Sequence, residues 1–506
     1  MDDPARLATP PVERASQDDL AGAIGAILPA LDAFLRYEGP DRAPDRSAWL
    51  PGLDEPLPEA GAGRDAVLAI LRDVVIPNGL RTGHPGFLGW VTTGPSIVPA
   101  AAGLAQAIAA PQRWWVHPAN HLDSLAVEWV RDLLGFPAQV VGTFTSGGAT
   151  ANLVGLGAAR QHAGERLGID VSLDGVGAIP APRVYATSET HHVVGRALGT
   201  LGLGRANVHA VPLDRGRRMD LRALEAAIDE DVRAGRTPVA VVGNAGDVNT
   251  GIVDPLPGIA AIAHARGIWF HVDGAYGGWG LLDERVRERF GDPADYDSFA
   301  VDPHKWMAVP VGTGLALCRD REILSRAFRI EMGAYDRERE TSLEAAAARP
   351  VDALPWEELG RGTPDWGVDF STPARGLAVW ALLKEVGAAG MRERIVRHDD
   401  AARALATLVR ATPELELLAE PELSICVFRH RPAGMDDPAA LDAHNAAILR
   451  ELRRRGRSLP SATRVGDRDG LRACFLNPRN EAVEAAILVD EVLAAARGLK
   501  AGPRPA

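Results

Sequence analysis

Short apolar segments alternate with helical patterns from about residue 118 to residue 318, and this alternation limits the possible folds more than any other feature of the sequence. The segments that predict strands are residues 183–186, 208–212, 239–243, 268–272, 298–301 and 314–318. Helices are predicted at residues 123–134, 150–161, 221–234 and 257–265. Strands that alternate with helices form a mainly parallel sheet with helices on both faces. We therefore expect an α/β fold.

The regions on either side predict smaller units. Leucine and isoleucine recur at helical spacing from Leu20 to Leu31, and a Pro/Gly-rich linker follows at residues 50–63. Near the C-terminus, a long helix through residues 380–387 precedes a mixed pattern. That pattern comprises helices at residues 399–410, 439–455 and 481–495 and strands at residues 424–430 and 471–476. We expect an N-terminal helical segment (residues 1–100), a large domain (101–385) and a small α+β domain (386–506).

Charge and composition exclude several classes of protein. The formal net charge of -12 argues against a nucleic-acid binder, which needs clustered Lys and Arg. Apolar stretches such as residues 97–110 are interrupted and fall short of the roughly 20 residues that a membrane span needs. No cysteine lies in a C-x-x-C pair, so we expect buried thiols and no metal site. The start of the chain lacks a signal-peptide pattern, and we expect a cytoplasmic protein.

A lysine follows one of the predicted strands. Residues 298–301 form the strand, and Pro303, His304 and Lys305 come shortly after it. Ligands of open α/β sheets bind at the carboxyl edge of the strands. A partly desolvated, neutral lysine at this edge can attack an aldehyde. Taken alone, Lys305 is more often an ordinary surface residue on a turn.

A carboxylate follows the neighbouring predicted strand in the same way. Asp273 ends the segment Trp-Phe-His-Val-Asp, and the small residue Ala275 stands two positions later. A carboxylate at this edge can pair with a pyridinium nitrogen, and the protonated ring then withdraws electrons from a carbanion. Ala275 leaves room for a flat ring. The competing interpretation is an aspartate that caps a turn.

Two further segments suit the binding of a cofactor. Gly147, Gly148 and Ala149 open a predicted helix, whose free N–H groups and positive dipole end suit a phosphate. The spacing is neither that of a P-loop nor that of a dinucleotide-binding fingerprint. His191 and His192 follow another strand, and an imidazole there can stack on an aromatic ring. Because adjacent residues of a helix point in different directions, at most one of these histidines belongs to the site.

In their order along the chain, from the glycine helix start through the histidine and Asp273 to Lys305, these four segments resemble the group II pyridoxal-5′-phosphate (PLP)-dependent decarboxylases. That family includes aromatic-L-amino-acid, glutamate, histidine and cysteine-sulfinate decarboxylases. The most specific match is residues 302–306, Asp-Pro-His-Lys-Trp, followed by residues 271–276, His-Val-Asp-Gly-Ala-Tyr. The resemblance extends from residue 84 to residue 479. It implies a fold type I, aminotransferase-like large domain with a seven-stranded sheet. It also implies a homodimer with active sites at the subunit interface, across which the N-terminal segment packs, so that residues 84–93 help to form the substrate pocket.

The resemblance further implies that PLP is the cofactor and that an L-amino acid is converted to its amine and CO2, with an aromatic substrate favoured. Lys305 would hold PLP as a Schiff base, Asp273 would pair with the pyridinium nitrogen, and His191 would stack on the ring. Ala275 would lie against the other face of the ring. The phosphate would be held by Gly147, Gly148 and Ala149, with help from Asp302 or His304.

A tyrosine on a mobile loop is the usual proton donor in this family, and Tyr335 stands at the corresponding place. A phenylalanine at that position is associated with oxidative aldehyde synthesis, so Tyr335 favours simple decarboxylation. Trp90 and Trp114 are candidates for an aromatic substrate pocket, although tryptophan is more often found in a core or an interface.

The sequence departs from the family pattern at three places. Asp247 stands where the family commonly has threonine, and a carboxylate there can repel substrate carboxylates or have a raised pKa. Residues 371–373 read Ser-Thr-Pro in place of Ser-Arg-Arg, although Arg375 is retained. The loop around Tyr335 is also one residue longer than usual. These departures concern the substrate and the outcome of the reaction rather than the cofactor.

Two other interpretations remain open. Another fold type I PLP enzyme, such as an aminotransferase, a lyase or a decarboxylating aldehyde synthase, would use the same lysine, aspartate and phosphate loop. CO2 release without consumption of a keto-acid acceptor distinguishes a decarboxylase from an aminotransferase. The third possibility is a binding scaffold that kept the fold without catalysis, and the presence of both Lys305 and Asp273 argues against it.

Overall fold

The structure is a computed structural model that describes residues 19–41, 45–110, 112, 118–328 and 366–500. Its largest feature is a seven-stranded sheet with the strand order β2-β8-β7-β6-β5-β3-β4. The strands are β2 (Val141–Thr145), β3 (Pro182–Thr187), β4 (Val208–Val211), β5 (Thr237–Asn244), β6 (Trp269–Asp273), β7 (Ser298–Val301) and β8 (Gly314–Cys318). Strands β3 to β7 pair in parallel, whereas β8 pairs antiparallel with both β7 and the edge strand β2. The predicted α/β class and the six strands predicted for this sheet are therefore confirmed.

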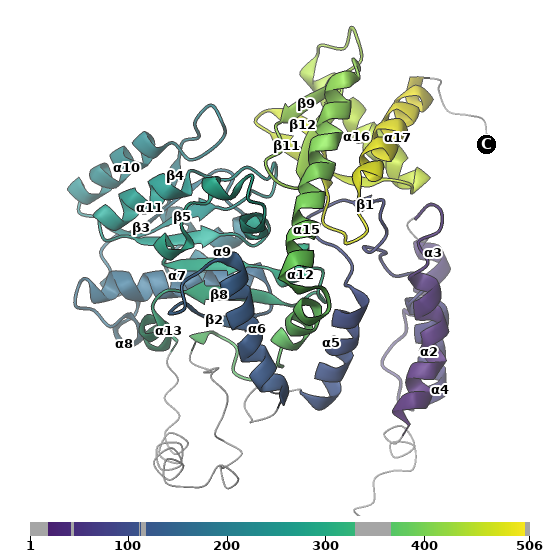
Figure 1. Ribbon diagram of the computed structural model, residues 1–506, viewed down its shortest axis with the longest axis horizontal. Coiled ribbons are helices and arrows are strands. Elements are labelled where there is room, and N and C mark those ends of the chain that lie inside the picture. The colour runs from purple at the N-terminus through teal and green to yellow at the C-terminus, as the bar shows by residue number, and fades with distance from the viewer. Residues whose placement is uncertain (1–18, 42–44, 111, 113–117, 329–365, 501–506) are drawn as a thin grey trace, which may run out of the picture.

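Helices cover both faces of this sheet and enclose two separate hydrophobic clusters (Figure 1). One cluster receives side chains from α6 (Pro118–Leu134), α10 (Leu221–Arg233), α11 (Leu256–Ala265) and α15 (Gly376–Ala411). The other cluster receives side chains from α7 (Gly148–Glu165), α9 (His192–Thr200) and α13 (Arg321–Ala327). Apolar residues thus lie on both faces of the strands β8, β7, β6, β5, β3 and β4. This is typical of parallel sheets.

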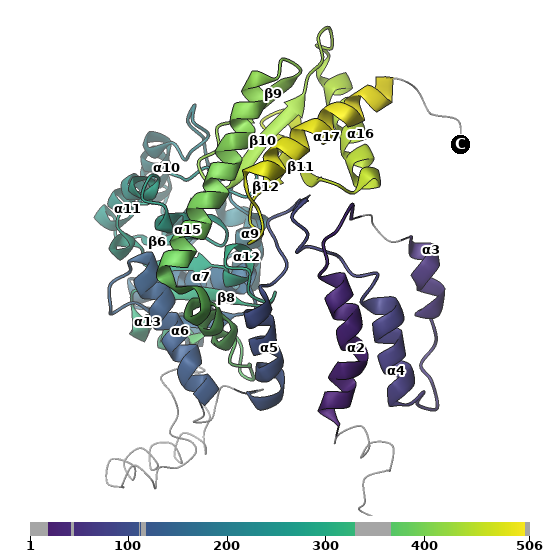
Figure 2. The same ribbon diagram turned by 45° about the vertical axis from the view of Figure 1, so that its right-hand side comes forward.

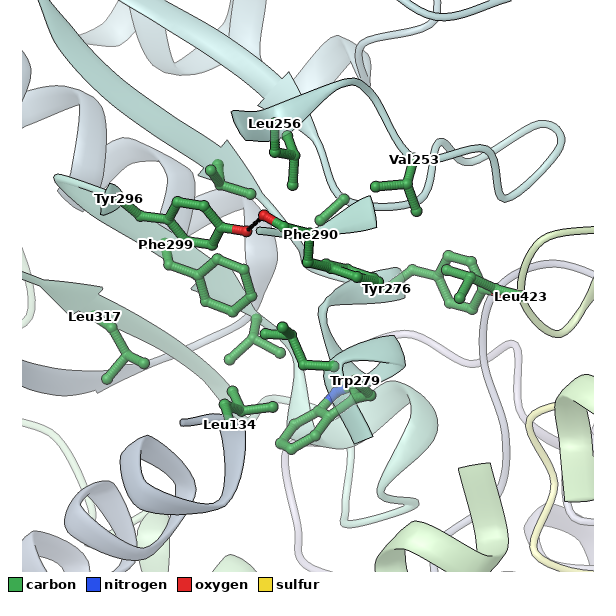
Figure 3. Packing of buried hydrophobic residues seen from close by; sticks show 14 of the residues in the cluster. Leu134, Val253, Leu256, Tyr276, Trp279, Phe290, Tyr296, Phe299, Leu317 and Leu423 are labelled. Atoms are coloured by element: carbon green, nitrogen blue, oxygen red, sulfur yellow. Dashed lines mark hydrogen bonds between the residues drawn. The ribbon is translucent and has the colours of Figure 1, made fainter. Parts of the chain in front are cut away.

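Large aromatic side chains fill the first cluster behind the carboxyl edge of the sheet. Trp279, Phe290, Tyr296 and Phe299 are fully buried, and Figure 3 shows them packed with Leu134 and its neighbours. Complete burial of one such apolar side chain contributes about 1.5–3 kcal/mol. This packing gives the strand ends that carry the site a rigid base.

The small C-terminal sheet has the strand order β1-β11-β12-β10-β9. Its strands are β1 (Phe87–Leu88), β9 (Leu415–Ala419), β10 (Ile425–His430), β11 (Leu459–Val465) and β12 (Arg468–Cys474), and they pack with α16 (Pro438–Arg455) and α17 (Ala482–Lys500). Because β1 pairs in parallel with β11, residues from the N-terminal region complete this C-terminal sheet. Strands β1, β2, β9 and β11 were not predicted, since they are short or carry alternating polar residues.

The long helix α15 joins the two sheets. The helices predicted at residues 380–387 and 399–410 both lie within α15, which consists of two helices joined across a kink, so the expectation of two helices is confirmed. They are divided only at Gly387, whose φ of 69° is not helical. A glycine adopts this left-handed conformation without the steric cost of a Cβ atom. The proposed domain boundary after residue 385 lies close to this kink.

The N-terminal helices stand beside the rest of the chain. Helices α2 (Leu20–Phe34) and α4 (Arg64–Ile70) lie side by side, apart from the large sheet (Figures 1 and 2). Neither helix contains a buried residue, although α2 consists mainly of apolar residues. Within the described ranges, no helix combines the length and the apolar character needed to cross a membrane. Cys318, Cys426 and Cys474 are all buried free thiols, as expected.

Candidate active site

A cavity opens at the carboxyl edge of β5, β6 and β7. Its lining residues are Val91, Gly148, Ala149, Glu189, His191, Val193, Asn244, Gly246, Asp247, Val248, Asp273, Ala275, Tyr276, Asp302 and Lys305. Of the residues predicted from the sequence, seven line this one cavity: Lys305, Asp273, His191, Ala275, Gly148, Ala149 and Asp302. They come from strand ends that are far apart in the sequence, and the parallel register brings them to one edge.

Lys305 is held by a buried carboxylate. Strand β7 ends at Val301, and Asp302 precedes the short helix α12 (Pro303–Trp306), which carries the lysine. The Nζ atom of Lys305 lies 3.1 Å from Oδ2 of Asp302. The carboxylate of Asp302 is buried, and its Oδ1 atom has no hydrogen-bond partner among the described residues. The pair keeps the amine at the cavity, because leaving either charge buried alone would be costly.

Asp273 lies at the same edge, one strand away. In the register of the sheet it is opposite Asn244 of β5 and Ala300 of β7. Its Oδ1 atom accepts a hydrogen bond of 3.1 Å from the backbone N–H of Ala275. The turn after β6 therefore fixes the carboxylate at one side of the cavity.

His191 is a partly buried residue at the start of α9. Burial lowers the pKa of His191 to about 4, although the nearby charge of Asp273 acts in the opposite direction. The Nδ1 atom of His191 accepts a hydrogen bond of 3.3 Å from the backbone N–H of Val193. The imidazole is therefore uncharged at neutral pH and suits contact with a flat aromatic ring. His192 does not line the cavity, which agrees with the expectation that only one of the two histidines does.

The beginning of α7 closes the cavity on another side, and only glycine fits there. A Cβ atom added to Gly148 would lie 2.6 Å from Oδ2 of Asp302 and 2.9 Å from Cβ of Ala275. The preceding Gly147 has a φ of 148° and caps the helix. Gly148 and Ala149, the first residues of α7, line the cavity. The N–H groups of a helix's first turn lack intrahelical partners and suit a phosphate.

A buried chain of hydrogen bonds supports this helix start. The Nδ2 atom of Asn152 donates to the carbonyl oxygen of Gly148 (2.8 Å), and Oδ1 of Asn152 lies 2.8 Å from Nε2 of His271. The other ring nitrogen of His271 lies 2.8 Å from Oγ of Ser298. Burial lowers the pKa of His271 to about 4. The chain ties the glycine turn to β6 and β7.

Two predicted residues lie beside the cavity but are not part of its lining. The Nδ1 atom of His304 is 2.8 Å from the carbonyl oxygen of Thr313, and its Nε2 atom is 3.9 Å from Oδ2 of Asp302. Gly147 is buried, and a Cβ atom placed on it would lie 3.3 Å from Cε1 of His304. His304 therefore lies behind the glycine turn to which Gly147 belongs.

Asp247, the residue that departs from the family pattern, lines the cavity but directs its carboxylate into its own turn. Its Oδ1 atom accepts hydrogen bonds from the N–H groups of Asn249 (2.7 Å) and Thr250 (2.8 Å). Its Oδ2 atom accepts from the hydroxyl of Thr250 and from the N–H of Ile252. Burial raises the pKa of Asp247 in spite of these bonds. The expected raised pKa is confirmed, and the side chain also shapes the turn.

Sequence reasoning missed Glu189 and Asn244. Glu189 stands two residues before His191, and its carboxylate accepts hydrogen bonds from Arg217 (2.5 Å) and Asn249 (2.9 Å). Asn244 ends β5 and donates a bond of 2.8 Å to Asp254. The rule that strand ends carry site residues would have identified Asn244. No local signal in the sequence distinguished Glu189.

The remaining candidates are placed as follows. Tyr335 and Trp114 lie outside the described residues. Trp90 is half exposed with a φ of 53°, and its neighbour Val91 lines the cavity. In the segment that departs from the family pattern, Thr372 is buried, while Arg375 donates a hydrogen bond of 2.9 Å to the carbonyl oxygen of Gly312.

The residues present fit PLP. A lysine amine, a carboxylate and a glycine helix start face one cavity, as an aldehyde, a pyridine nitrogen and a phosphate require. Had Lys305 and Asp273 lined separate cavities, this assignment would have failed. Among the described residues there is no cluster of three or more metal-ligating side chains.

Comparisons with known proteins agree with this chemistry. Residues 48–431 match the family described as "Pyridoxal-dependent decarboxylase conserved domain". An aromatic-L-amino-acid decarboxylase of Bacillus atrophaeus is 29% identical over 435 residues, which cover 85% of each chain. An L-2,4-diaminobutyrate decarboxylase of Rhizobium meliloti is 28% identical over 450 residues, covering 88% of this chain and 85% of the relative. The fold is similar to that of an Oryza sativa TDC solved with PLP and tryptamine, with a TM-score of 0.84, 22% identity and coverage of 97% of this chain and 100% of that one.

Proposed function

This chain belongs to the pyridoxal-dependent decarboxylase family, and we propose that it converts an aromatic L-amino acid to its amine and CO2 with Lys305 and Asp273 holding the cofactor. Membership of the family makes the protein a PLP-dependent carboxy-lyase that acts on an amino acid. The observation that carries the residue assignment is that Lys305, Asp273 and the glycine start of α7 line one cavity. The aromatic preference and the residue roles are the proposed part.

PLP, when bound, takes up the electron pair that remains on Cα after CO2 leaves. Lys305 supplies the amine that attaches the cofactor. Oδ2 of Asp302 forms an ion pair with this amine at 3.1 Å. Asp273 would keep a proton on the ring nitrogen. His191 would contact the ring as an uncharged imidazole and so would add no positive charge at the cofactor. Tyr335, outside the described residues, is the proposed donor of the proton to Cα.

The charges around the cavity support a substrate without a second carboxylate. Among the described lining residues the basic groups are Lys305 and His191, and both have roles at the cofactor. The lining also contains the carboxyl groups of Glu189 and Asp247, and these described residues offer no further cation to a second substrate carboxylate. Val91 and Val248 add apolar surface. The similarity to an aromatic-L-amino-acid decarboxylase favours an aromatic side chain.

A diamino acid is the second candidate substrate. The carboxylate of Glu189 would attract a side-chain ammonium group, and one relative is an L-2,4-diaminobutyrate decarboxylase. Glu189 is already paired with Arg217, however, and its charge is largely satisfied. This pairing ranks the diamino acid behind the aromatic amino acid.

The exposed apolar residues of the N-terminal helices support a homodimer. At least one third of the surface is exposed in each of five apolar residues: Leu20, Leu28 and Leu31 of α2, and Ile97 and Ile108 of α5 (Ile97–Ala109). Apolar surface of this extent is usually covered by another chain. We expect a second copy to pack on α2, α4 and α5. Light scattering of the purified protein tests this proposal, and a monomer at micromolar concentration would contradict it.

The cytoplasm is the proposed location, because free thiols such as Cys318, Cys426 and Cys474 are maintained in a reducing compartment. An experiment that locates the protein after fractionation of the cells tests this.

The function is tested with a panel of amino acids on the PLP-loaded protein, in which CO2 and the product are both measured. We expect CO2 and amine from aromatic amino acids, much less from 2,4-diaminobutyrate, and least from glutamate and cysteine sulfinate. Lys305→Ala serves as the control and should release no CO2 from any substrate while its oligomeric state is unchanged. Preferred turnover of glutamate would overturn the substrate assignment, and an active Lys305→Ala protein would overturn the residue assignment.

A further inference from the structure

The turn at residues 247–252 contacts both the cavity and the small C-terminal sheet. It follows β5, and an antiparallel bridge between Ala245 and Val253 closes its base. Asp247 and Val248 line the cavity from one side of this turn. Four donors within the turn bind the carboxylate of Asp247, so the backbone has little freedom. A displacement of this turn would therefore also displace the part of the cavity wall that Asp247 and Val248 form.

Asn249 connects the cavity to the small sheet through its side-chain amide. Its Nδ2 atom donates a hydrogen bond of 2.9 Å to Oε2 of Glu189, which lines the cavity. Its Oδ1 atom accepts a hydrogen bond of 3.0 Å from the hydroxyl of Thr463 on β11. The amide nitrogen thus contacts a cavity residue and the amide oxygen contacts the small sheet. These two contacts define the orientation of the amide.

The small sheet holds the same turn at a second point. Arg472 of β12 is buried and donates a hydrogen bond to the carbonyl oxygen of Val248. The Nε atom of Arg472 donates to Oγ of Ser461 (3.2 Å), so the guanidinium is itself oriented by β11. Two independent contacts therefore fix the turn relative to the small sheet.

Glu189 passes this constraint on to His191. The two residues are separated by one position in the segment between β3 and α9. On the other side of Glu189, the guanidinium of Arg217 donates a hydrogen bond of 2.5 Å to Oε1. A shift of Asn249 would remove one of these two contacts and leave the carboxylate to Arg217 alone. Hydrogen bonds through Asn249 thus link the segment that carries His191 to the small sheet.

We propose that Asn249 is a positioning residue that ties Glu189, and through it His191, to the small C-terminal sheet, so that the cavity has its binding geometry only while that sheet is docked. This inference rests on the proposed assignment of the cavity to PLP. Asn249 does not itself line the cavity, and its effect on the reaction is exerted through Glu189. The geometry makes the small sheet a part of cofactor binding.

Two isosteric substitutions separate the contacts. Asn249→Asp keeps an acceptor for Thr463 but places a carboxylate against Glu189, whereas Thr463→Val removes only the contact with the small sheet. We expect the dissociation constant for PLP to rise roughly 10- to 100-fold in Asn249→Asp, since a hydrogen bond to a charged group is lost. Thr463→Val should raise it by about 2- to 10-fold, as expected for one neutral hydrogen bond. Thr463→Ser, which retains the hydroxyl, should bind PLP as the unaltered protein does.

PLP binding is measured by titration of the cofactor-free protein, followed by cofactor absorbance and protein fluorescence, together with the midpoint of thermal unfolding. The double variant should bind PLP no more weakly than Asn249→Asp alone, because both changes break one chain. A purely structural role would lower the unfolding midpoint and leave the dissociation constant unchanged, and that result would overturn the proposal. Additive effects of the two substitutions would also overturn it, and Thr463→Val gives the answer if Asn249→Asp does not fold.

Failure of the proposed function would look different. After borohydride reduction, mass spectrometry of the unaltered protein should find PLP on the peptide that contains Lys305. If PLP is attached elsewhere, the site assignment fails, whatever the Asn249 variants do. If PLP is attached to Lys305 and the variants bind it normally, the inference about Asn249 alone is wrong.

Discussion

The substitution Gly148→Ala would test the geometry of the cavity most directly. The added Cβ atom would lie 2.9 Å from Cβ of Ala275, against the 3.4 Å at which ordinary van der Waals contact begins, a shortfall of 0.5 Å. It would also lie 2.6 Å from Oδ2 of Asp302, a shortfall of 0.8 Å. Asp302 is buried and holds Lys305 at 3.1 Å, so moving it away disturbs the amine.

Overpacking of this kind costs about 1–3 kcal/mol. The cofactor-free protein can relieve the clash by moving the start of α7 outwards, but binding of PLP would require the helix to return. If the whole cost falls on binding, the dissociation constant for PLP rises roughly 5- to 150-fold, since about 1.4 kcal/mol corresponds to a factor of ten. The assay is a PLP titration of the cofactor-free protein, monitored by cofactor absorbance.

Gly195→Ala is the matched control. Gly195 lies in α9, where an added Cβ atom would meet its nearest neighbour, Cγ of Arg205, at an ordinary 3.7 Å. The control should bind PLP normally and keep or slightly raise the unfolding midpoint, because alanine is the better helix former. If Gly148→Ala bound PLP as tightly as this control, the start of α7 would not hold the cofactor as argued.

Three further predictions concern the proton on the ring nitrogen, the reaction product and the pH dependence of stability. Asp273→Asn should lower kcat by roughly 100-fold or more with KM little changed, because the amide cannot stabilise a protonated ring nitrogen; steady-state kinetics at saturating PLP that show a normal kcat would contradict this. Tyr335→Phe should divert product from amine to aldehyde, as product analysis by mass spectrometry will show, and unchanged amine output would remove Tyr335 as the proton donor. Burial lowers the pKa of His271 to about 4, whereas an unfolded histidine titrates near about 6.5. The unfolded chain therefore binds more protons between these values, and stability should fall as pH is lowered through this range. His271→Gln should flatten that part of the unfolding-midpoint profile, and an equally steep profile in the variant would refute the assignment.

Several parts of the site could be predicted because their signals are local. Lys305 and Asp273 each follow a short apolar strand, and Gly147 and Gly148 open a helix, so a few neighbouring residues suffice to identify them. Six strands of the large sheet, β3 to β8, were predictable for the same reason, since each contains a short apolar run, whereas β2 was not. Strand β1 was not predictable, because Phe87 and Leu88 become a strand only by pairing with Leu459 and Pro460.

The sequence by itself determined the reactive groups of this protein and the order in which the strands present them, because strand periodicity, helix starts and short motifs depend on residues close together in the chain. Only the tertiary structure decided that Glu189 belongs to the cavity and that Thr463 supports it through Asn249. Asn249 and Thr463 are 214 positions apart, and their contact exists only because β11 docks against the turn after β5. Such contacts between distant residues leave no periodic trace in the sequence, since a hydroxyl and an amide are common at many exposed positions.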